Sequence, residues 1–266
     1  MIKLNFELMT SNFENKTIVI SGIARGIGKA LALQAVKLNM NVAGVDIREE
    51  ALEELRVQLA SNNCKHYLQV VDIRDAEACE TFINACKTQL GQIDMLINNA
   101  GITFIAPEKE TSISATKNLM DINFMGTVHL SHFALPEIIR NHGTLASVSS
   151  VAGYSPLLYR TAYAASKHAV WGYLGSLRAE LRMEQVQVLT ICPSFVNTEL
   201  QESQQKYFKN STQEALTPSM VASQIFQAIE NRKDLVLIGK TAKRVFWLNR
   251  WFPKLYEKIM IKKTKI

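Results

Sequence analysis

The chain is poor in cysteine, lacks long apolar runs and has no segment of biased composition. Its four cysteines are too few for a disulfide framework, and none forms the C-x-x-C pair of a metal or redox site, so we expect free thiols in a reducing compartment. No window approaches the ~18 apolar residues of a membrane span, and residues 1–16 contain no run of signal-peptide length. We therefore expect a cytoplasmic protein without a bound metal. The cysteines are Cys64, Cys79, Cys86 and Cys192.

Linkers and internal repeats are also missing, which favours a single domain. The 266 residues, 47% of them hydrophobic and 20% charged, suit one large α/β domain. From Lys240 onward there are nine basic residues and one acid, or +8, so the preceding part carries 6 − 8 = −2. We expect a main domain over 1–240 and a basic extension over 241–266. Because the charge is local and no nucleic-acid-binding motif is present, nucleic acid is excluded as a partner.

Short β-branched runs alternate with longer segments of helical periodicity. Near-continuous apolar strands separated by helices predict a doubly wound α/β fold, a seven-stranded parallel sheet covered on both faces. Ligands of such folds bind beyond the carboxyl ends of the strands. The predicted strands are 16–21, 41–46, 67–73, 94–100, 144–150, 186–192 and 234–239, and the clearest helices are 28–39, 48–61 and 76–91.

A glycine-rich turn, "SGIARGIG", follows the first predicted strand. Gly22, Gly26 and Gly28 permit a sharp turn with exposed backbone N–H groups, and the next helix aims its positive end at a bound phosphate. The second strand ends in Asp46, 18 residues after Gly28, where a carboxylate can accept from ribose hydroxyls and repel a 2′-phosphate. This favours NAD. Arg25 and Arg48 could each pair with a 2′-phosphate or lie solvated at the surface, so NADP stays open.

Tyr163 and Lys167 are four residues apart, which places them on one face of a helix. The surrounding sequence, "AYAASKHAVWGYLGS", is mostly small or apolar, so this helix should be buried rather than solvent-facing. A buried charged lysine needs a partner. We interpret the pair as catalytic, and the histidines His129, His132, His142 and His168 as structural.

From about residue 14 to 240 the chain resembles the short-chain dehydrogenase/reductase family. The resemblance rests on ordered motifs: "SGIARGIG" (21–28), "VDI" (71–73), "NNAG" (98–101), Asn123, Ser150, "YAASK" (163–167) and "CPSFVNT" (192–198). It implies an alcohol–carbonyl oxidoreductase with a Rossmann-like fold and a nicotinamide cofactor. It also implies that Ser150, Tyr163 and Lys167 are catalytic and that Asn123 supports a proton relay. The family's thirteen-residue spacing to the tyrosine selects Ser150 over Ser149.

The resemblance implies cofactor contacts along the strand ends. Asp72 would accept from the adenine amino group, although it could equally cap the next helix, and Thr198 would contact the nicotinamide amide. Ser194 stands where the family usually has glycine. The implied cofactor-binding residues are Ser21, Gly22, Arg25, Gly26, Ile27, Gly28, Asp46, Asp72, Ile73, Asn99, Ala100, Gly101, Tyr163, Lys167, Pro193, Val196 and Thr198.

The chemistry explains these residue types. A phenol can give a proton to a carbonyl oxygen but, with a pKa of about 10, is a poor base in reverse. We expect Lys167 and oxidised nicotinamide to lower the pKa of Tyr163, so that it works in both directions. Ser150 would hold the substrate oxygen beside the phenol.

Two segments should form the substrate pocket: 151–159 and the polar segment 199–218, whose length suggests a lid. These segments contain no arginine cluster that would bind an anionic group, so we expect an apolar alcohol or ketone: fatty, steroid-like or aromatic. The expected apolar wall consists of Phe104, Leu157, Leu158, Tyr159 and Phe195.

The basic extension has apolar residues at 245, 248, 252, 255 and 259, with Pro253 placed to break the helix. Packing on the body or on a second subunit and lying on an anionic membrane surface are both open. Family analogy predicts a dimer or tetramer. The rival to an enzyme is a non-catalytic nucleotide-binding redox sensor or membrane-surface adaptor of the same fold.

Overall fold

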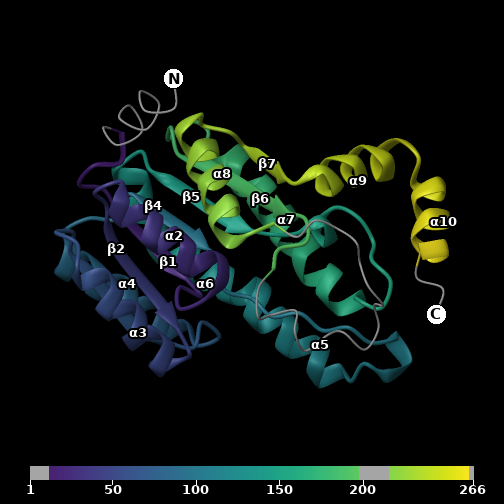
Figure 1. The fold of residues 1–266 in the computed structure, drawn as a ribbon, viewed down its shortest axis with the longest axis horizontal. Helices are drawn as coiled ribbons and strands as arrows, with labels where there is room; N and C mark the ends of the chain where they lie inside the picture. Colours follow the sequence, from purple (N-terminus) through teal and green to yellow (C-terminus); the bar gives the residue numbers. More distant parts are fainter. Residues whose placement is uncertain (1–11, 198–215, 264–266) are drawn as a thin grey trace.

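Seven parallel strands form one sheet in the computed structural model, which describes residues 12–197 and 216–263 (Figure 1). The strand order is β3-β2-β1-β4-β5-β6-β7. All seven strands overlap the ranges predicted from sequence, and the doubly wound fold is confirmed. They are β1 (Thr17–Ser21), β2 (Asn41–Asp46), β3 (His66–Val70), β4 (Met95–Asn98), β5 (Thr144–Val148), β6 (Gln187–Pro193) and β7 (Leu235–Ile238).

Helices cover both faces of the sheet, which gives three layers. Along β1, Ile18 and Ile20 face one apolar cluster while Val19 faces the other, because neighbouring side chains of a strand point to opposite faces. The first cluster is completed by α2 (Gly26–Lys37), α3 (Glu49–Ala60) and α8 (Pro218–Glu230). The second is completed by α4 (Ala76–Leu90), α6 (Gly126–Arg140) and α7 (Thr161–Glu180).

The remaining elements lie above the carboxyl edge or at the chain end. A short α5 (Ile113–Met120) runs directly into a π-helical turn, η2 (Asp121–Met125), and then into α6. Two 3₁₀ turns, η1 (Glu108–Glu110) and η3 (Val151–Gly153), follow β4 and β5. All four cysteines are free thiols, and those at 79, 86 and 192 are buried, as expected.

β3, β4, β5 and β7 each end before their predicted ends. In β3 and β5, polar side chains near the predicted end bond to the following turn. β3 stops at Val70, since the Asp72 carboxylate accepts from the Arg74 backbone N–H instead of extending the strand. β5 stops at Val148, and Ser150 instead caps η3 by accepting from the Ala152 N–H. Both side chains therefore sit in loops at the carboxyl edge, where ligands of this fold bind.

β1 pairs with β2 on one side and with β4 on the other, so the strand order reverses here. The crevice at such a reversal is the usual ligand site of open α/β sheets. The strand ends beside it carry the glycine turn after Ser21 and the Asn99–Gly101 segment after Asn98.

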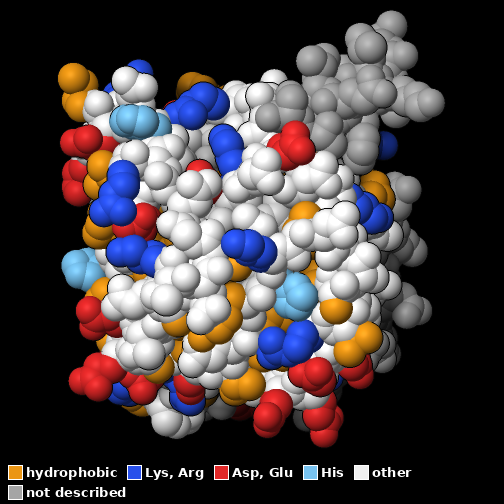
Figure 2. Space-filling view, turned by 90° about the vertical axis from the view of Figure 1, so that its left-hand side faces the viewer, with side chains coloured by type: hydrophobic (Ala, Val, Ile, Leu, Met, Phe, Trp, Pro, Cys, Tyr) orange, Lys and Arg blue, Asp and Glu red, His pale blue; other side chains and the backbone are white. Residues whose placement is uncertain are grey.

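The C-terminal extension forms two helices, α9 (Lys240–Trp251) and α10 (Pro253–Lys263), which meet at the break expected from Pro253. None of the helices within the described ranges is long and apolar enough to cross a membrane. At the opposite end of the molecule, on the side of α3 and α4, acidic and basic side chains are intermingled (Figure 2). The division of the chain at residue 240 stays a prediction.

Candidate active site

The glycine turn leaves no room for side chains. Gly22 and Gly26 have φ of +64° and +54°, a left-handed conformation that disfavours other residues. A Cβ on Gly22 would lie 2.8 Å from the Ala100 Cα, and one on Gly28 would lie 2.1 Å from the Gly22 carbonyl oxygen. These glycines therefore let the turn pack closely against Ala100 and the start of α2, at the place where the resemblance puts a diphosphate.

The helix that follows offers its amino end to the same space. Arg25 precedes α2 with an extended backbone, and among the described residues no side chain caps the helix. The first turn, Gly26 to Gly28, holds no acidic residue. Backbone N–H groups without intrahelical partners and the positive end of the helix suit a phosphate at this point. The residues present therefore fit a dinucleotide.

Ser21 and Asn99 hold the two central strand ends together. The Ser21 hydroxyl accepts from the N–H groups of Asn99 and Ala100, each at 3.0 Å. The Asn99 amide donates to the carbonyls of Ser21 and Gly22, also at 3.0 Å. These bonds hold the glycine turn next to the Asn99–Gly101 segment. Both segments therefore line the crevice between β1 and β4.

Asp46 lies beside the glycine turn, as predicted, with a buried carboxylate. One oxygen accepts from the Ala24 N–H at 3.1 Å. The other accepts from the backbone N–H of Arg48 at 3.2 Å and from its guanidinium at 3.3 Å. Two carboxylate oxygens offer about four acceptor positions, so three donors leave room for a ribose hydroxyl. Arg48, which the sequence left open between two roles, is paired with the acid and half exposed.

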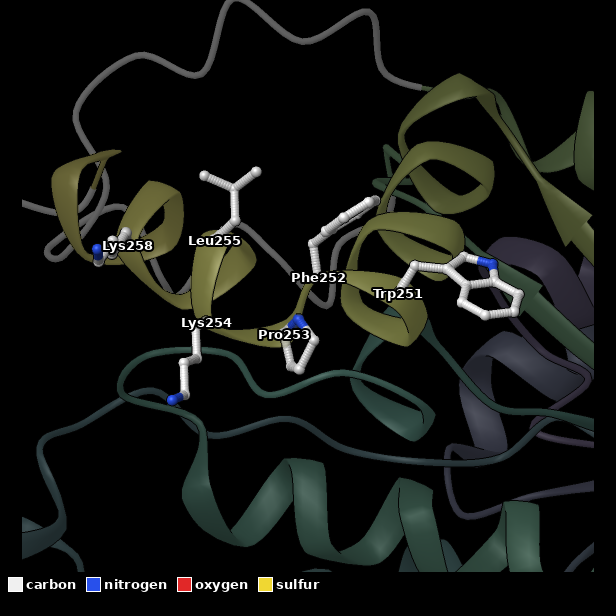
Figure 3. Close-up of a pocket in the computed structure, with 6 residues that line it drawn as sticks. All are labelled: Trp251, Phe252, Pro253, Lys254, Leu255 and Lys258. Carbon is white, nitrogen blue, oxygen red and sulfur yellow. The ribbon is translucent and has the colours of Figure 1, made fainter.

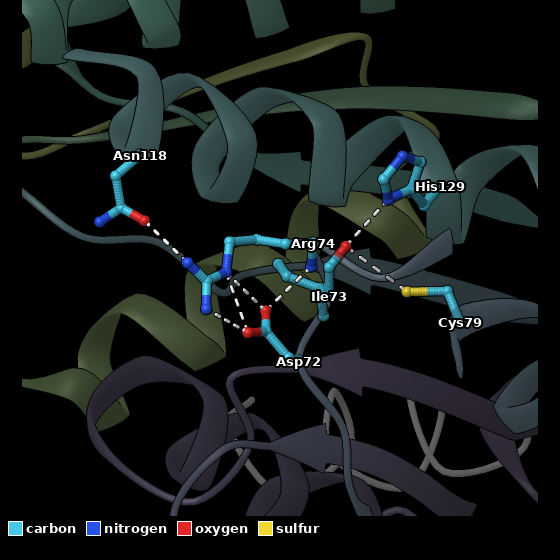
Figure 4. A network of polar contacts seen from close by, with 6 residues as sticks. All are labelled: Asp72, Ile73, Arg74, Cys79, Asn118 and His129. Carbon is cyan, nitrogen blue, oxygen red and sulfur yellow. Dashed lines mark hydrogen bonds and ion pairs between the residues drawn. The ribbon is translucent and has the colours of Figure 1, made fainter. Parts of the chain in front are cut away.

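Asp72 binds an arginine that the sequence reading did not consider. The Arg74 guanidinium pairs with Asp72 and also donates to the Asn118 side chain at 3.0 Å (Figure 4). This hydrogen-bonded ion pair lowers the pKa of Asp72. The alternative that Asp72 caps the next helix is wrong, because Asp75 caps α4 by accepting from the Ala78 N–H. The adenine contact of Asp72 stays a prediction.

Ile73 is buried next to α6, in the loop that follows β3. Its carbonyl accepts from the His129 ring at 2.9 Å, which agrees with a structural role for this histidine (Figure 4). A Cβ on Gly126 would collide with the Ile73 side chain at 2.4 Å. The close approach of α6 therefore fixes the loop that carries Asp72.

The proposed catalytic side chains lie together. Tyr163 and Lys167 are both buried on α7, and the Lys167 Nζ lies 5.9 Å from the centre of the Tyr163 ring. The Ser150 hydroxyl lies close enough to the Tyr163 phenol to act on its pKa, which it lowers. Ser149 is instead buried and donates to the Lys167 carbonyl, which supports the choice of Ser150.

The expected lowering of the Tyr163 pKa is not found. Burial of the phenol raises its pKa above the ordinary value and outweighs the lowering by Ser150. The expectation was wrong because it counted the neighbouring charge and omitted the desolvation of the phenolate.

Sequence reasoning missed Arg160, whose guanidinium lies 5.7 Å from the centre of the Tyr163 ring. Its charge acts to lower the pKa of Tyr163, while burial lowers the pKa of Arg160 itself. Its place in sequence was the available signal, because Arg160 directly precedes α7 and Tyr163 lies in the first turn of that helix.

Lys167 has its expected partner in a backbone carbonyl. Its Nζ donates to the Val148 carbonyl at 2.9 Å, at the carboxyl end of β5. Burial of the ammonium lowers the pKa of Lys167 to about 8. This lysine therefore changes charge near neutral pH.

Burial of Lys167 should give protein stability a measurable pH dependence. The unfolded chain retains a lysine pKa near 10.5, so it binds more protons than the folded chain between about pH 8 and 10.5. Relative to the Lys167→Met variant, the free energy of unfolding of the wild type should rise with pH across this window by roughly 3 kcal/mol, because the other buried titratable groups are common to both proteins. Urea unfolding of both proteins across the window measures it, and parallel profiles would contradict the burial of a titrating lysine.

Asn123 lies in the π-helical turn rather than in a regular helix. Its fully buried amide accepts from the Ile102 N–H at 2.8 Å and donates to the Ser166 hydroxyl at 2.9 Å. Asn123 thus connects the loop after β4 to the catalytic helix. A Cβ on Gly101 would contact both the Asn123 side chain and the Lys167 Nζ, so the three residues are neighbours. The proton relay stays a prediction.

The end of β6 borders the same edge. Pro193 ends the strand, and Val196 forms an isolated parallel bridge with Leu216. Ser194, which replaces the family's glycine, donates its N–H to the Ile238 carbonyl at 2.9 Å, so the turn is made without that glycine. Thr198 and most of the 199–218 segment lie outside the described residues.

The residues of the expected apolar wall come from three loops, after β4, before α7 and after β6, and the first two lie side by side. The Ala106 N–H donates to the Tyr159 carbonyl at 2.9 Å, which ties the loop after β4 to the segment before α7. Leu157 packs against the apolar cluster that contains Tyr163. Phe104 and Phe195 expose more than a third of their surfaces. Of the expected wall residues named here, Leu157 is the one that the apolar cluster links to Tyr163.

Comparison with known proteins gives one consistent family. The family model described as "short chain dehydrogenase" matches residues 16–207. Dehydrogenase/reductase SDR family member 7B of Xenopus laevis is 31% identical over 265 residues, covering 93% of this chain and 81% of that protein. Dehydrogenase/reductase SDR family protein 7-like of Anopheles gambiae is 30% identical, covering 96% and 84%.

Solved structures show the same fold. A short-chain dehydrogenase/reductase from Burkholderia phymatum in complex with NAD matches with a TM-score of 0.83 at 24% identity, covering 91% of this chain and 95% of that one. A short-chain dehydrogenase from Burkholderia cenocepacia in complex with NADP matches with a TM-score of 0.81 at 21% identity, covering 93% and 98%.

Proposed function

The chain belongs to the short-chain dehydrogenase family of oxidoreductases, and we propose that it interconverts a secondary alcohol and a ketone using NAD in preference to NADP. One observation carries this proposal: Tyr163 is buried beside Ser150 and Lys167, at the carboxyl edge of the sheet next to the glycine turn. This arrangement places a group for acid–base catalysis beside a crevice that suits a dinucleotide.

The side chains divide the work as follows. The Tyr163 phenol gives a proton to the oxygen of a ketone or takes it from an alcohol, and the Ser150 hydroxyl donates a hydrogen bond to the same oxygen. A nicotinamide cofactor held at the glycine turn and Asp46 would supply the hydride exchange with the substrate carbon and, when oxidised, a positive charge. Lys167, charged below about pH 8, stabilises the phenolate that remains after proton donation. Asn123 positions Ser166, next to that lysine, on the catalytic helix.

The substrate proposed is apolar near its carbinol carbon: fatty, steroid-like or aromatic. Leu157 packs against the cluster that contains Tyr163, and Phe104 and Phe195 expose apolar surface in loops at the carboxyl edge of the sheet. A panel of secondary alcohols and ketones graded in chain length, run with each cofactor and followed by the absorbance of reduced nicotinamide, tests the proposal. Turnover only of short, charged substrates would contradict it.

A non-catalytic redox sensor or adaptor of the same fold is not favoured, because it would need neither a buried tyrosine and lysine pair nor Ser150 beside that tyrosine. We further propose a cytoplasmic homo-oligomer, a dimer or tetramer, by analogy with the family. Light scattering of the purified protein tests the oligomeric state.

The cofactor preference depends on the charge of Asp46. In the Asp46→Asn variant, an amide oxygen can still accept from the Ala24 N–H, but repulsion of a 2′-phosphate is removed and Arg48 loses its ion-pair partner. The preference for NAD over NADP, measured as the ratio of kcat/KM values, should fall at least about tenfold, which is ~1.4 kcal/mol.

Asp94→Asn is the matched control, because Asp94 is also buried and also accepts from a backbone N–H, that of Thr17 at 2.8 Å. It lies at the other end of the sheet, where β4 begins. The ratio of its kcat/KM values for NAD and NADP should equal that of the wild type. A wild type that already prefers NADP would contradict the role proposed for Asp46.

A further inference from the structure

The two C-terminal helices expose an unusual amount of apolar surface. Fifteen large apolar side chains are exposed among the described residues, and six of them lie between 247 and 261. Trp251 and Phe252 are 66% and 61% exposed. We call this set the α9–α10 surface: Trp247, Trp251, Phe252, Leu255, Ile259 and Ile261.

These helices are nevertheless firmly attached to the body. The Tyr154 hydroxyl donates to the Ala242 carbonyl at 2.8 Å, the Asn249 amide donates to the Tyr154 carbonyl, and the Tyr256 hydroxyl donates to the Pro156 carbonyl, both at 2.9 Å. Phe246 packs against the rings of Tyr154 and Trp171. One side of the helix pair therefore serves the fold, and the other side stays exposed while the helices are in place.

Cations share the exposed side with the aromatic residues. On α9, Arg244 precedes Trp247 by three residues and Arg250 follows it by three, so these side chains are neighbours on one face. On α10, Lys258 and Lys262 follow Leu255 by three and seven residues, on the same face as Ile259. Among the described residues of the two helices, Glu257 is the one acid.

A hollow of about 450 Å³ opens at the elbow between the helices, lined by Trp251, Phe252, Pro253, Lys254, Leu255 and Lys258 (Figure 3). Phe252 and Leu255 project to one side of the elbow, and Lys254 projects to the other (Figure 3). Apolar groups and ammonium groups thus border one depression.

We propose that the α9–α10 surface docks on an anionic lipid bilayer. Indole and aliphatic groups rimmed by lysine and arginine suit the boundary between acyl chains and charged headgroups. The segment from Lys240 onward carries +8 while the rest of the chain carries −2. A second copy docking by the same surface would bring two such segments together, so like charges oppose that occupant.

Docking would bring the bilayer close to the substrate side. Tyr154 and Pro156, which hold the two helices, lie between Ser150 and Tyr163 in the chain. If the proposed function is correct, an apolar substrate dissolved in the bilayer would reach the catalytic edge without crossing much water. This consequence rests on the proposed function, whereas the docking itself does not.

Sedimentation of the full-length protein with vesicles tests the docking. Binding to phosphatidylcholine vesicles containing phosphatidylserine should exceed binding to phosphatidylcholine alone by roughly tenfold or more, and should weaken with added salt. The double variant Trp251→Ser/Leu255→Ser should lose at least about tenfold in affinity, and Lys254→Gln/Lys258→Gln should lose the salt dependence in part.

The matched control is Ile113→Ser/Met183→Ser, which removes two apolar side chains that are 85% and 89% exposed elsewhere on the surface. It should bind vesicles like the wild type, and thermal unfolding should show all variants folded. Equal binding to neutral and anionic vesicles, or self-association abolished by the Trp251 and Leu255 substitutions without vesicle binding, would overturn the proposal. Because sedimentation does not measure turnover, an inactive protein that binds vesicles would refute the proposed function alone.

Discussion

Replacing Tyr163 by phenylalanine should abolish nearly all oxidoreductase activity while the protein stays folded. The variant keeps the ring against its apolar neighbours and removes only the group that exchanges a proton with the substrate oxygen. General acid–base catalysis of this kind contributes about 10² to 10⁴ to the rate, so kcat should fall roughly a thousandfold or more. Cofactor affinity should change little, which isothermal titration with NAD would show.

Tyr67→Phe is the control for loss of a tyrosine hydroxyl. Tyr67 lies on β3, stacks on Phe82 and donates its hydroxyl to Gln69 at 3.1 Å, remote from the catalytic helix. Its activity should match the wild type. A Tyr163→Phe enzyme that turns over at the Tyr67→Phe rate would remove the phenol from the mechanism and leave the family assignment untouched.

Adding one methyl group at Gly28 should eliminate cofactor binding. The new Cβ would lie 2.1 Å from the Gly22 carbonyl oxygen and 2.8 Å from the Asn99 amide nitrogen, both parts of the bonded frame of the turn. Because backbone atoms must move to relieve this contact, we expect Gly28→Ala to weaken NAD binding by more than about a hundredfold and to destabilise the fold by ~1–3 kcal/mol. Titration of cofactor and urea unfolding measure the two effects.

Gly172→Ala separates the steric effect from the general effect of replacing a glycine. Gly172 lies on α7, the helix that carries Tyr163, and a Cβ there would meet nothing within 4 Å. An alanine in an open helical position should stabilise the protein by about 0.5–1 kcal/mol and leave cofactor binding unchanged. Unaltered NAD affinity in Gly28→Ala would mean that the diphosphate does not lie on the glycine turn.

Much of the scaffold was predictable because its pattern is local. Apolar strands between amphipathic helices predicted all seven strands and their parallel arrangement, and Pro253 predicted the break between the last two helices. The four-residue spacing of Tyr163 and Lys167 predicted their shared face. Spacing along a helix or strand fixes such relations without knowledge of the rest of the chain.

The electrostatics of the site depended on contacts that the sequence does not show. The rise in the pKa of Tyr163 comes from burial by residues distant in sequence, and the acceptor of Lys167 is a carbonyl at the end of another strand. Asp72 pairs with Arg74 only because the strand ends two residues before the acid. Each of these depends on tertiary packing. Composition and spacing alone therefore identified the site residues, but they did not predict the pKa shifts or the hydrogen-bond partners of these residues.

The attachment of the last two helices to Tyr154 and Pro156 has an evolutionary consequence. Substitutions in a terminal region are usually tolerated, because few other residues of the fold contact it. Here, mutations in α9 or α10 would shift the segment of Tyr154 and Pro156, which lies between Ser150 and Tyr163 in the chain, without altering any group that exchanges protons. The range of accepted compounds could therefore diverge between descendants of this enzyme while their chemistry stays the same.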